Sequence, residues 1–112
     1  MRASDESGPT GALVVLCTAP SDGVARDLAR TLVGEGRVAC ANLVPGVTSV
    51  YRWQGEVHED AEVLLVLKLP AGGWAGLERR VLELHPYDTP ELVALEPGRV
   101  EARYLAWLLD EA

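Results

Sequence analysis

Apolar residues form two nearly continuous runs in this chain, and such runs are typical of buried strands. The run at 12–18 reads ALVVLCT and the run at 60–69 reads DAEVLLVLKL. A strand that is covered on both faces needs no alternation of polar positions, which is why both runs predict central strands. A shorter run at 92–95, LVAL, predicts a further strand.

Two other segments repeat apolar residues at helical spacing and predict amphipathic helices. In the first, apolar positions recur every four residues over 24–32, and Ser21 is a suitable N-cap. Gly34 and Gly36 follow and end the helix by allowing a left-handed C-cap. The second helix is predicted over 74–84, because apolar positions again recur at helical spacing and a proline follows soon after.

The segment 37–57 is the longest β-rich stretch of the chain. Pro45 and Gly46 interrupt it, and because proline cannot donate a ladder hydrogen bond they predict a bulge on an edge strand. Gln54 and Gly55 predict the tip of a hairpin. A strand of this length exceeds what a domain of 112 residues needs for itself. We therefore expect a hairpin arm that projects from the domain and has something to pair with.

The order of these elements predicts an α+β fold of the ferredoxin-like βαββαβ pattern, with the long hairpin arm and an extra helix around 104–108. We expect one domain over 12–112, after a disordered tail at 1–11. The helices would cover one face of the sheet. In the strand at 60–69, however, both alternating sets of positions are apolar, so the opposite face would also be apolar. This pattern predicts oligomerisation, although it does not give the number of subunits.

The charge balance excludes two classes of partner. The chain has 17 acidic and 10 basic residues, a net charge of -7 and a pI of about 4.7. A protein that binds nucleic acid or an anionic membrane needs a basic face, so neither partner is expected. Residues 1–11 contain no apolar signal segment, and two cysteines in apolar runs fit a reducing compartment. We therefore expect a cytoplasmic protein.

Four segments of the chain together resemble a known family. They are VVLCTAP at 14–20, ACANLVPGVTSVYRWQGEV at 39–57, EVLLVLK at 62–68 and LHPYDTPELVAL at 84–95. Their sequences, order and spacing resemble the divalent-cation-tolerance family named CutA, over about residues 12–110. The resemblance implies a ferredoxin-like homotrimer in which the arm reaches a neighbouring subunit. It also implies a role in the response to divalent cations, notably copper.

The CutA resemblance implies a metal site as well. The family's proposed site corresponds to Cys17 and His85, and Glu91 is a further oxygen donor close in sequence. Thiolate and imidazole are the soft ligands that copper favours. Some relatives have two histidines before the Pro-Tyr pair, whereas this chain has Leu84 at the first of these positions. We therefore expect only weak binding of copper or another divalent cation, with no cofactor required.

Each of these three residues also has a purely structural interpretation. Cys17 falls on the same strand face as Leu13 and Val15, which suits a buried structural thiol. His85 ends a helix, where an imidazole can hydrogen-bond the last carbonyls or stabilise the turn. Glu91 follows a proline at a strand start, where it can fix the turn. The residues alone leave both interpretations open.

Lys68 is a charged residue at the end of an apolar strand. A desolvated lysine needs a carboxylate or a bound anion as its partner. If a trimer covers Lys68, we expect it to face an intersubunit cleft beside Tyr87 and the arm aromatics Tyr51 and Trp53. The alternative is that the side chain extends its amine into solvent.

Three functions are compatible with the sequence. The first is a cation-response protein. The second is a trimeric interaction or signalling module that binds a small effector between subunits, because the CutA trimer resembles that of the PII proteins. The third is a stable scaffold. An enzyme is not expected, because the chain has two histidines, no CxxC pair, no glycine-rich phosphate loop and no serine nucleophile motif.

Overall fold

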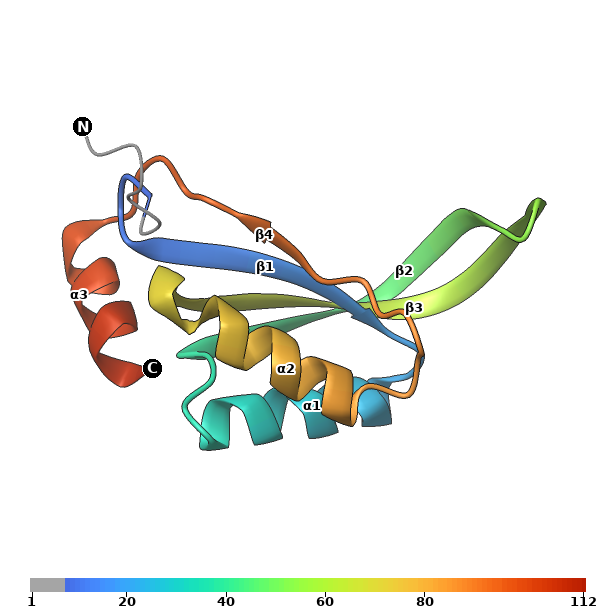
Figure 1. The fold of residues 1–112 in the computed structure, drawn as a ribbon, viewed down its shortest axis with the longest axis horizontal. Helices are drawn as coiled ribbons and strands as arrows, with labels where there is room; N and C mark the ends of the chain where they lie inside the picture. The colour runs from blue at the N-terminus through green and yellow to red at the C-terminus, as the bar shows by residue number, and fades with distance from the viewer. Residues whose placement is uncertain (1–7) are drawn as a thin grey trace.

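The computed structural model describes residues 8–112 (Figure 1). In chain order its elements are β1 (Ala12–Ala19), α1 (Asp22–Gly34), β2 (Cys40–Trp53), β3 (Glu56–Pro70), the short 3-10 helix η1 (Ala71–Gly73), α2 (Trp74–Leu84), β4 (Val93–Leu95) and α3 (Ala102–Glu111). Before β1, residues 8–11 form a turn in which the Thr10 hydroxyl donates to the Pro97 carbonyl over 3.3 Å. The rest of the predicted tail, residues 1–7, lies outside the described residues. No helix in the described part combines the length and apolarity that a membrane span needs.

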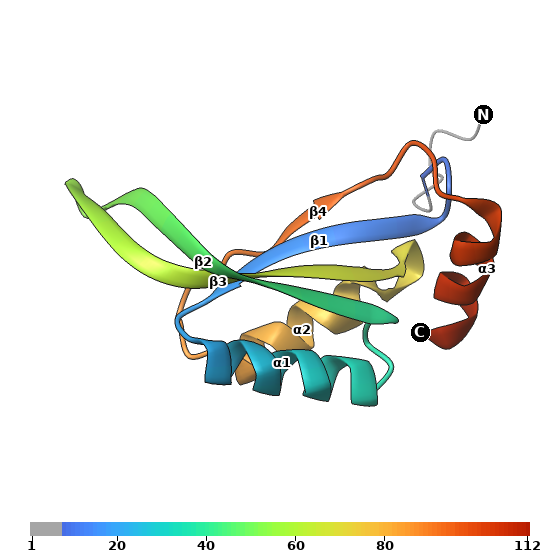
Figure 2. The same cartoon turned by 180° about the vertical axis from the view of Figure 1, so that it is seen from behind.

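The four strands form one antiparallel sheet in the order β2-β3-β1-β4. This order interleaves the two βαβ units as in the ferredoxin-like fold. α1 and α2 lie side by side on one face of the sheet, and α3 packs at the end of the sheet far from the arm (Figures 1 and 2). The predicted βαββαβ order with an added C-terminal helix is therefore confirmed for the single chain.

Both ends of α1 carry the signals expected from the sequence. The Ser21 hydroxyl accepts a hydrogen bond from the Val24 N–H over 3.2 Å, as an N-cap does. At the other end Gly36 has a φ of 72°, and the Arg37 N–H donates to the Leu32 carbonyl over 2.8 Å. This is a Schellman ending, so Gly36 takes the left-handed conformation that the sequence predicted for this stretch.

β2 and β3 continue together beyond the rest of the sheet and form the predicted arm (Figure 1). The register of the pair shifts between Val44 and Val47, so the predicted bulge is present, and it lies on edge strand β2. At the tip, Gln54 and Gly55 have φ angles of 50° and 81°, as in a two-residue type I′ turn.

The return strand of the arm is longer than the apolar pattern indicated. β3 begins at Glu56, whereas the apolar run predicted a start at 60. The added residues are mostly exposed and are held by pairing with β2. A hydrophobic pattern does not reveal strand pairing of this kind.

One face of the sheet packs against α1 and α2 and forms the core. Val15 and Cys17 of β1 and Leu65 and Leu67 of β3 are at most 1% exposed there. Because these residues alternate with the other set along each strand, the core uses only half of the apolar strand positions. The helices complete the core with Ala25, Leu28, Ala29, Leu32, Leu77 and Val81.

The opposite face of the sheet is called here the open face. It consists of Val14 and Leu16 of β1, Cys40, Asn42 and Val44 of β2, Leu64, Val66 and Lys68 of β3, and Val93 and Leu95 of β4. Val93 and Leu95 are 47% and 49% exposed, and the apolar residues of β1 and β3 on this face are only half-buried. α3 packs against β1 and β3 at one end of the sheet. The second apolar face that the sequence predicted is therefore present and lacks a full cover in the single chain.

Candidate functional site

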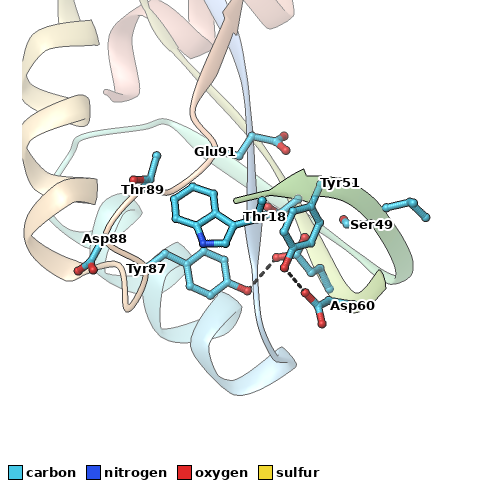
Figure 3. A pocket seen from close by; sticks show the side chains of 11 residues that line it. Thr18, Ser49, Tyr51, Asp60, Tyr87, Asp88, Thr89 and Glu91 are labelled. Atoms are coloured by element: carbon cyan, nitrogen blue, oxygen red, sulfur yellow. Dashed lines mark hydrogen bonds between the residues drawn. The ribbon is translucent and has the colours of Figure 1, made fainter. Parts of the chain in front are cut away.

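A cleft of about 600 Å³ lies between the arm and the loop that follows α2 (Figure 3). We call it the arm cleft; it is lined by Thr18 of β1, by Ser49, Val50, Tyr51, Trp53, Asp60 and Glu62 of the arm, and by Tyr87, Asp88, Thr89 and Glu91 of the loop. Figure 3 shows Tyr51 and Tyr87 approaching each other from its two walls, with Asp60 beside them. The arm cleft therefore joins three segments that are distant in sequence.

Strand alternation explains why the arm presents these residues to the cleft. Asp60 and Glu62 precede Leu64 at intervals of two residues, so all three point to the same side of β3. Ser49 is the register partner of Asp60 and shares that side. The arm cleft is therefore a continuation of the open face toward the tip of the arm.

His85 fastens the loop to β1. Its side chain is 7% exposed, its Nε2 lies 2.8 Å from the Thr18 carbonyl oxygen, and its Nδ1 accepts from the Tyr87 N–H over 3.1 Å. Because a backbone N–H can only donate and a carbonyl can only accept, the bonds select the neutral ring with its proton on Nε2. Both ring nitrogens are thus used within the protein, and the second bond positions Tyr87 at the cleft.

Cys17 lies directly behind the wall of the cleft. Its side chain is 1% exposed, and its Sγ lies 3.8 Å from the same Thr18 carbonyl oxygen that His85 contacts. Burial, followed by the charges of Glu91 and Glu62, raises the pKa of the Cys17 thiol from 9.0 to about 12. The thiol is therefore protonated at neutral pH.

Two tyrosines donate hydrogen bonds to carboxylates of the arm cleft. The Tyr87 hydroxyl donates to Glu62 Oε2 over 2.9 Å, and the Tyr51 hydroxyl donates to Asp60 Oδ2. Desolvation, and then the bond to Glu62, raises the pKa of Tyr87 to about 12. The bond to Asp60 is the main cause of a raised pKa at Tyr51. Both hydroxyls therefore stay protonated and hold the two carboxylates in place.

The lining of the arm cleft carries charge of one sign. It contains the four carboxylates of Asp60, Glu62, Asp88 and Glu91, and no Lys, Arg or His is among its described lining residues. His58 is close by, where its ring stacks on Tyr51 at a centroid distance of 5.5 Å, but it does not line the cleft. Such a lining attracts cations and repels anions.

Sequence reasoning selected the aromatic part of this cleft and missed most of its charge. The selected lining residues are Tyr51, Trp53, Tyr87 and Glu91, and the missed carboxylates are Asp60, Glu62 and Asp88. The usable signal was a pair of acidic residues two positions apart, immediately before an apolar strand run. Asp60 and Glu62 lie on the same side of β3 as Leu64 and Val66, but at the point where β3 extends beyond the core.

Lys68 lies away from the arm cleft in the single chain. Its ammonium group donates to the Asn42 amide oxygen, and its register partners are Val14 and Cys40. Six strand positions separate Lys68 from Glu62, which corresponds to roughly 20 Å at the usual rise of a strand. Any contact between Lys68 and the arm aromatics would therefore need a neighbouring subunit.

Two of the three predicted metal ligands approach one point, and the three do not form a ready-made metal site. Cys17 and His85 approach the same carbonyl oxygen, and Glu91 is near enough to influence the Cys17 thiol. Within residues 8–112, no three His, Cys, Asp or Glu side chains are arranged to hold a metal ion. A metal would have to displace the thiol proton or a main-chain bond to His85.

Comparisons with known proteins cover almost all of the chain. The family model described as CutA1 divalent ion tolerance protein matches residues 13–111. The divalent-cation tolerance protein CutA of Thermus thermophilus is 53% identical over 97 residues, which is 87% of this chain and 94% of the relative. The protein of the same name from Escherichia coli K12 is 40% identical over 104 residues, 93% of each chain.

Solved structures agree with the sequence comparisons. The divalent cation tolerance protein Cut A1 from Thermus thermophilus superimposes with a TM-score of 0.87 at 50% identity, covering 89% of this chain and 97% of the other. A CutA from Archaeoglobus fulgidus, named there as a periplasmic protein, has a TM-score of 0.84 at 27% identity and covers 87% and 94%.

Proposed function

This chain belongs to the CutA1 divalent ion tolerance protein family, and we propose that it acts in the response to divalent metal ions as a homotrimer that binds copper or another divalent cation weakly. The family is named for ion tolerance, and the proposal includes no catalytic step. We place this role in the cytoplasm, where the free thiols of Cys17 and Cys40 stay reduced.

The observation that carries the metal proposal is the approach of two soft donors, Cys17 and His85, to one carbonyl oxygen at the end of β1. The loop after α2 brings His85 to the carbonyl oxygen that Cys17 also approaches. Glu91 of the same loop lies close enough to help raise the pKa of the Cys17 thiol. A thiolate and an imidazole are ligands that suit copper, and the Glu91 carboxylate adds negative charge to their surroundings.

The same geometry supports weak binding. The Cys17 thiol has a pKa of about 12 and must lose its proton to become a good ligand. His85 must give up its bond to the Thr18 carbonyl or to the Tyr87 N–H before either ring nitrogen can bind a metal. Leu84 supplies no further ligand at the preceding position.

Calorimetric titration with Cu²⁺ at neutral pH tests this proposal. We expect weak, saturable binding that is lost in Cys17→Ser and in His85→Ala, because each removes one donor. His58→Ala is the matched control, since it removes the other imidazole of the chain, which lies on the arm. Equal titration curves for wild type, Cys17→Ser and His85→Ala would exclude this site.

The homotrimer is supported by the open face and the arm. Apolar residues of β1, β3 and β4 lie on a face that α1 and α2 do not cover. The arm adds exposed apolar side chains beyond the four-stranded part of the sheet, where Val50 and Val57 are more than half exposed. Surfaces of this kind are characteristic of subunit interfaces.

A second candidate function is effector binding by the trimer, and the arm cleft is the observation that favours it. Its volume of about 600 Å³ is within the range of small-molecule pockets, and its lining combines aromatic and polar side chains. This function does not depend on Cys17 or His85, which do not line the cleft.

A further inference from the structure

Lys68 is a cation whose partners within its own chain do not match its charge. It belongs to the open face, where its register partners are Val14 of β1 and Cys40 of β2. Its ammonium group donates to the Asn42 side chain, which is a neutral amide. No carboxylate forms an ion pair with Lys68 among the described residues. Because the side chain is only half-buried, solvent completes the hydration of the ammonium group in the single chain.

Covering the open face would remove that solvent from Lys68. In the proposed homotrimer the apolar side chains around it, such as Val14 and Val66, pack against a neighbouring subunit. An ammonium group that loses its water and keeps only a neutral partner opposes assembly, because a buried charge is stable only when it is paired. Lys68 therefore needs a carboxylate from the surface that covers it.

Glu62 is a carboxylate in the complementary situation. Its side chain is 9% exposed and lines the arm cleft. Its Oε2 accepts from the Tyr87 hydroxyl over 2.9 Å, which is its only side-chain hydrogen bond among the described residues, so the carboxylate can accept further N–H groups. Asp60, Asp88 and Glu91 add three more carboxylates to the lining, and no described cationic side chain joins them there. A neighbouring subunit that covers the cleft must supply positive charge.

Lys68 and Glu62 cannot meet within one chain. Both lie on the same side of β3, but six strand positions separate them, which corresponds to roughly 20 Å, and the two side chains are too short to bridge that distance. A closed ring of three subunits joins two different surfaces of each subunit, so one end of the open face can meet the other end of the next. Every subunit carries both residues, so each Lys68 in the ring has a Glu62 available.

From this complementarity we propose that, in the homotrimer on which this inference rests, Lys68 of each subunit enters the arm cleft of its neighbour and forms an ion pair with Glu62, beside Asp60. Its ammonium group donates to the carboxylate oxygen that Tyr87 does not occupy. The arm cleft is thus completed by a second copy of this chain. The ion pair specifies which surfaces meet, because any other arrangement leaves two charges buried without partners.

A double-mutant cycle in assembly tests the ion pair. Sedimentation velocity in a urea series measures the urea concentration at which the trimer dissociates, for wild type, Lys68→Met, Glu62→Gln and the double variant. Each single change should shift dissociation to lower urea, because it leaves the other charge without its partner. The double variant should lose less stability than the sum of the two single losses, since it removes both charges. Glutamine keeps an acceptor for the Tyr87 hydroxyl, and methionine keeps an unbranched apolar stem.

Carbodiimide coupling provides a test that does not depend on the stability of a variant. The reagent joins an amine and a carboxylate in direct contact through an amide, with loss of water. Mass spectrometry of digested wild type should identify a peptide pair that joins Lys68 to Glu62 or Asp60. This pair should occur only in species of two or three chains on a denaturing gel, because within one chain Lys68 and Glu62 are roughly 20 Å apart.

Arg103→Met is the matched control for the charge of Lys68. It removes a positive charge from an exposed position on α3, which packs at the same end of the sheet as Lys68, and should leave the cross-link and the urea profile unchanged. A monomeric wild type would contradict the homotrimer and the ion pair with it. A trimeric wild type in which the two single losses simply add, or in which Lys68 couples to neither carboxylate, would overturn the ion pair alone.

Discussion

At the scale of single residues, Cys17 and His85 combine structural and chemical roles. The sequence suggested that His85 could cap the carbonyls of its own helix or stabilise the turn after it; its ring accepts from the Tyr87 N–H within that turn and bonds to Thr18 of β1 in place of a helix carbonyl. These bonds position the loop that carries the cleft residues. Cys17 packs in the core as a small apolar residue, as its strand pattern indicated, while its sulfur lies at the edge of the candidate metal site.

The buried thiol of Cys17 predicts how stability depends on pH. Its pKa is raised in the folded state from 9.0 to about 12, so above pH 9 the unfolded chain loses a proton that the folded chain keeps. The contribution to stability is therefore full below pH 9 and declines as the pH rises toward 12. Tyr87, whose pKa is raised from 10.0 to about 12, adds to the decline in the same direction.

Urea denaturation at a series of pH values from neutral to alkaline measures this effect. Cys17→Ala should show a shallower loss of unfolding free energy above pH 9 than wild type. Cys40→Ala, which removes the less buried thiol, should keep the wild-type decline. An identical pH profile for Cys17→Ala and wild type would contradict the linkage to this thiol.

At the scale of elements, local signals positioned the ends of α1 and the tip of the arm. Ser21 caps the helix as its residue type indicated, and Gln54-Gly55 forms the predicted turn. The bulge on β2 could also be predicted, because proline has no N–H to donate to the neighbouring strand. The start of β3 could not, since strand pairing and not apolar pattern determines it.

Two neighbouring glycines at the end of α1 allow a matched test of this local control. Gly36 has a φ of 72°, so Gly36→Ala should destabilise the protein by about 1–2 kcal/mol. Gly34 is the last residue of the helix and lacks a positive φ, so Gly34→Ala should be neutral or stabilising by up to about 1 kcal/mol. Neither added Cβ would meet another atom within 4 Å, which leaves backbone conformation as the cause.

Thermal or urea unfolding of the two alanine variants supplies the measurement. Equal stabilities would show that the left-handed conformation at Gly36 carries no strain for alanine and would contradict the prediction.

At the scale of the whole molecule, the sheet has one face in the core and one face open. α1 and α2 bury Val15, Leu65 and Leu67, while Leu16 and Val66 on the opposite side remain only half-buried. The proposed trimer would cover these residues. The acidic arm cleft continues the same face toward the tip of the arm. Subunit assembly and the proposed ligand binding would therefore use adjacent parts of one surface.

Substitution on the open face should disrupt assembly without unfolding the chain. Val93 is 47% exposed on β4, and Val93→Asp should lower the molar mass in sedimentation equilibrium from that of a trimer toward that of a monomer, because a charge would be buried in the interface. Leu82→Asp is the matched control, because Leu82 is 57% exposed on α2 and lies off this face. A wild-type molar mass for Val93→Asp, or a monomeric wild type, would contradict the proposed use of this face.

The sequence by itself determined the order of the elements, the helix and hairpin ends, and the presence of a second apolar face. These features depend on periodicity and on residues such as Ser21, Gly36 and Gly55, whose conformational preferences act over a few neighbours. The same local patterns allowed Tyr51, Trp53, Tyr87 and Glu91 to be selected as candidates before their positions were known.

Only the tertiary structure decided what these candidates form together. The twist and pairing of the arm bring Asp60 and Glu62 across from a loop more than twenty residues away in sequence, and Lys68 is left at the far end of the strand. The charge of a cleft depends on which distant side chains meet in it, and residue spacing carries no information about such meetings. For that reason the sequence suggested Lys68 and the arm aromatics as parts of one intersubunit cleft, whereas within the single chain it is carboxylates that lie beside the aromatic rings.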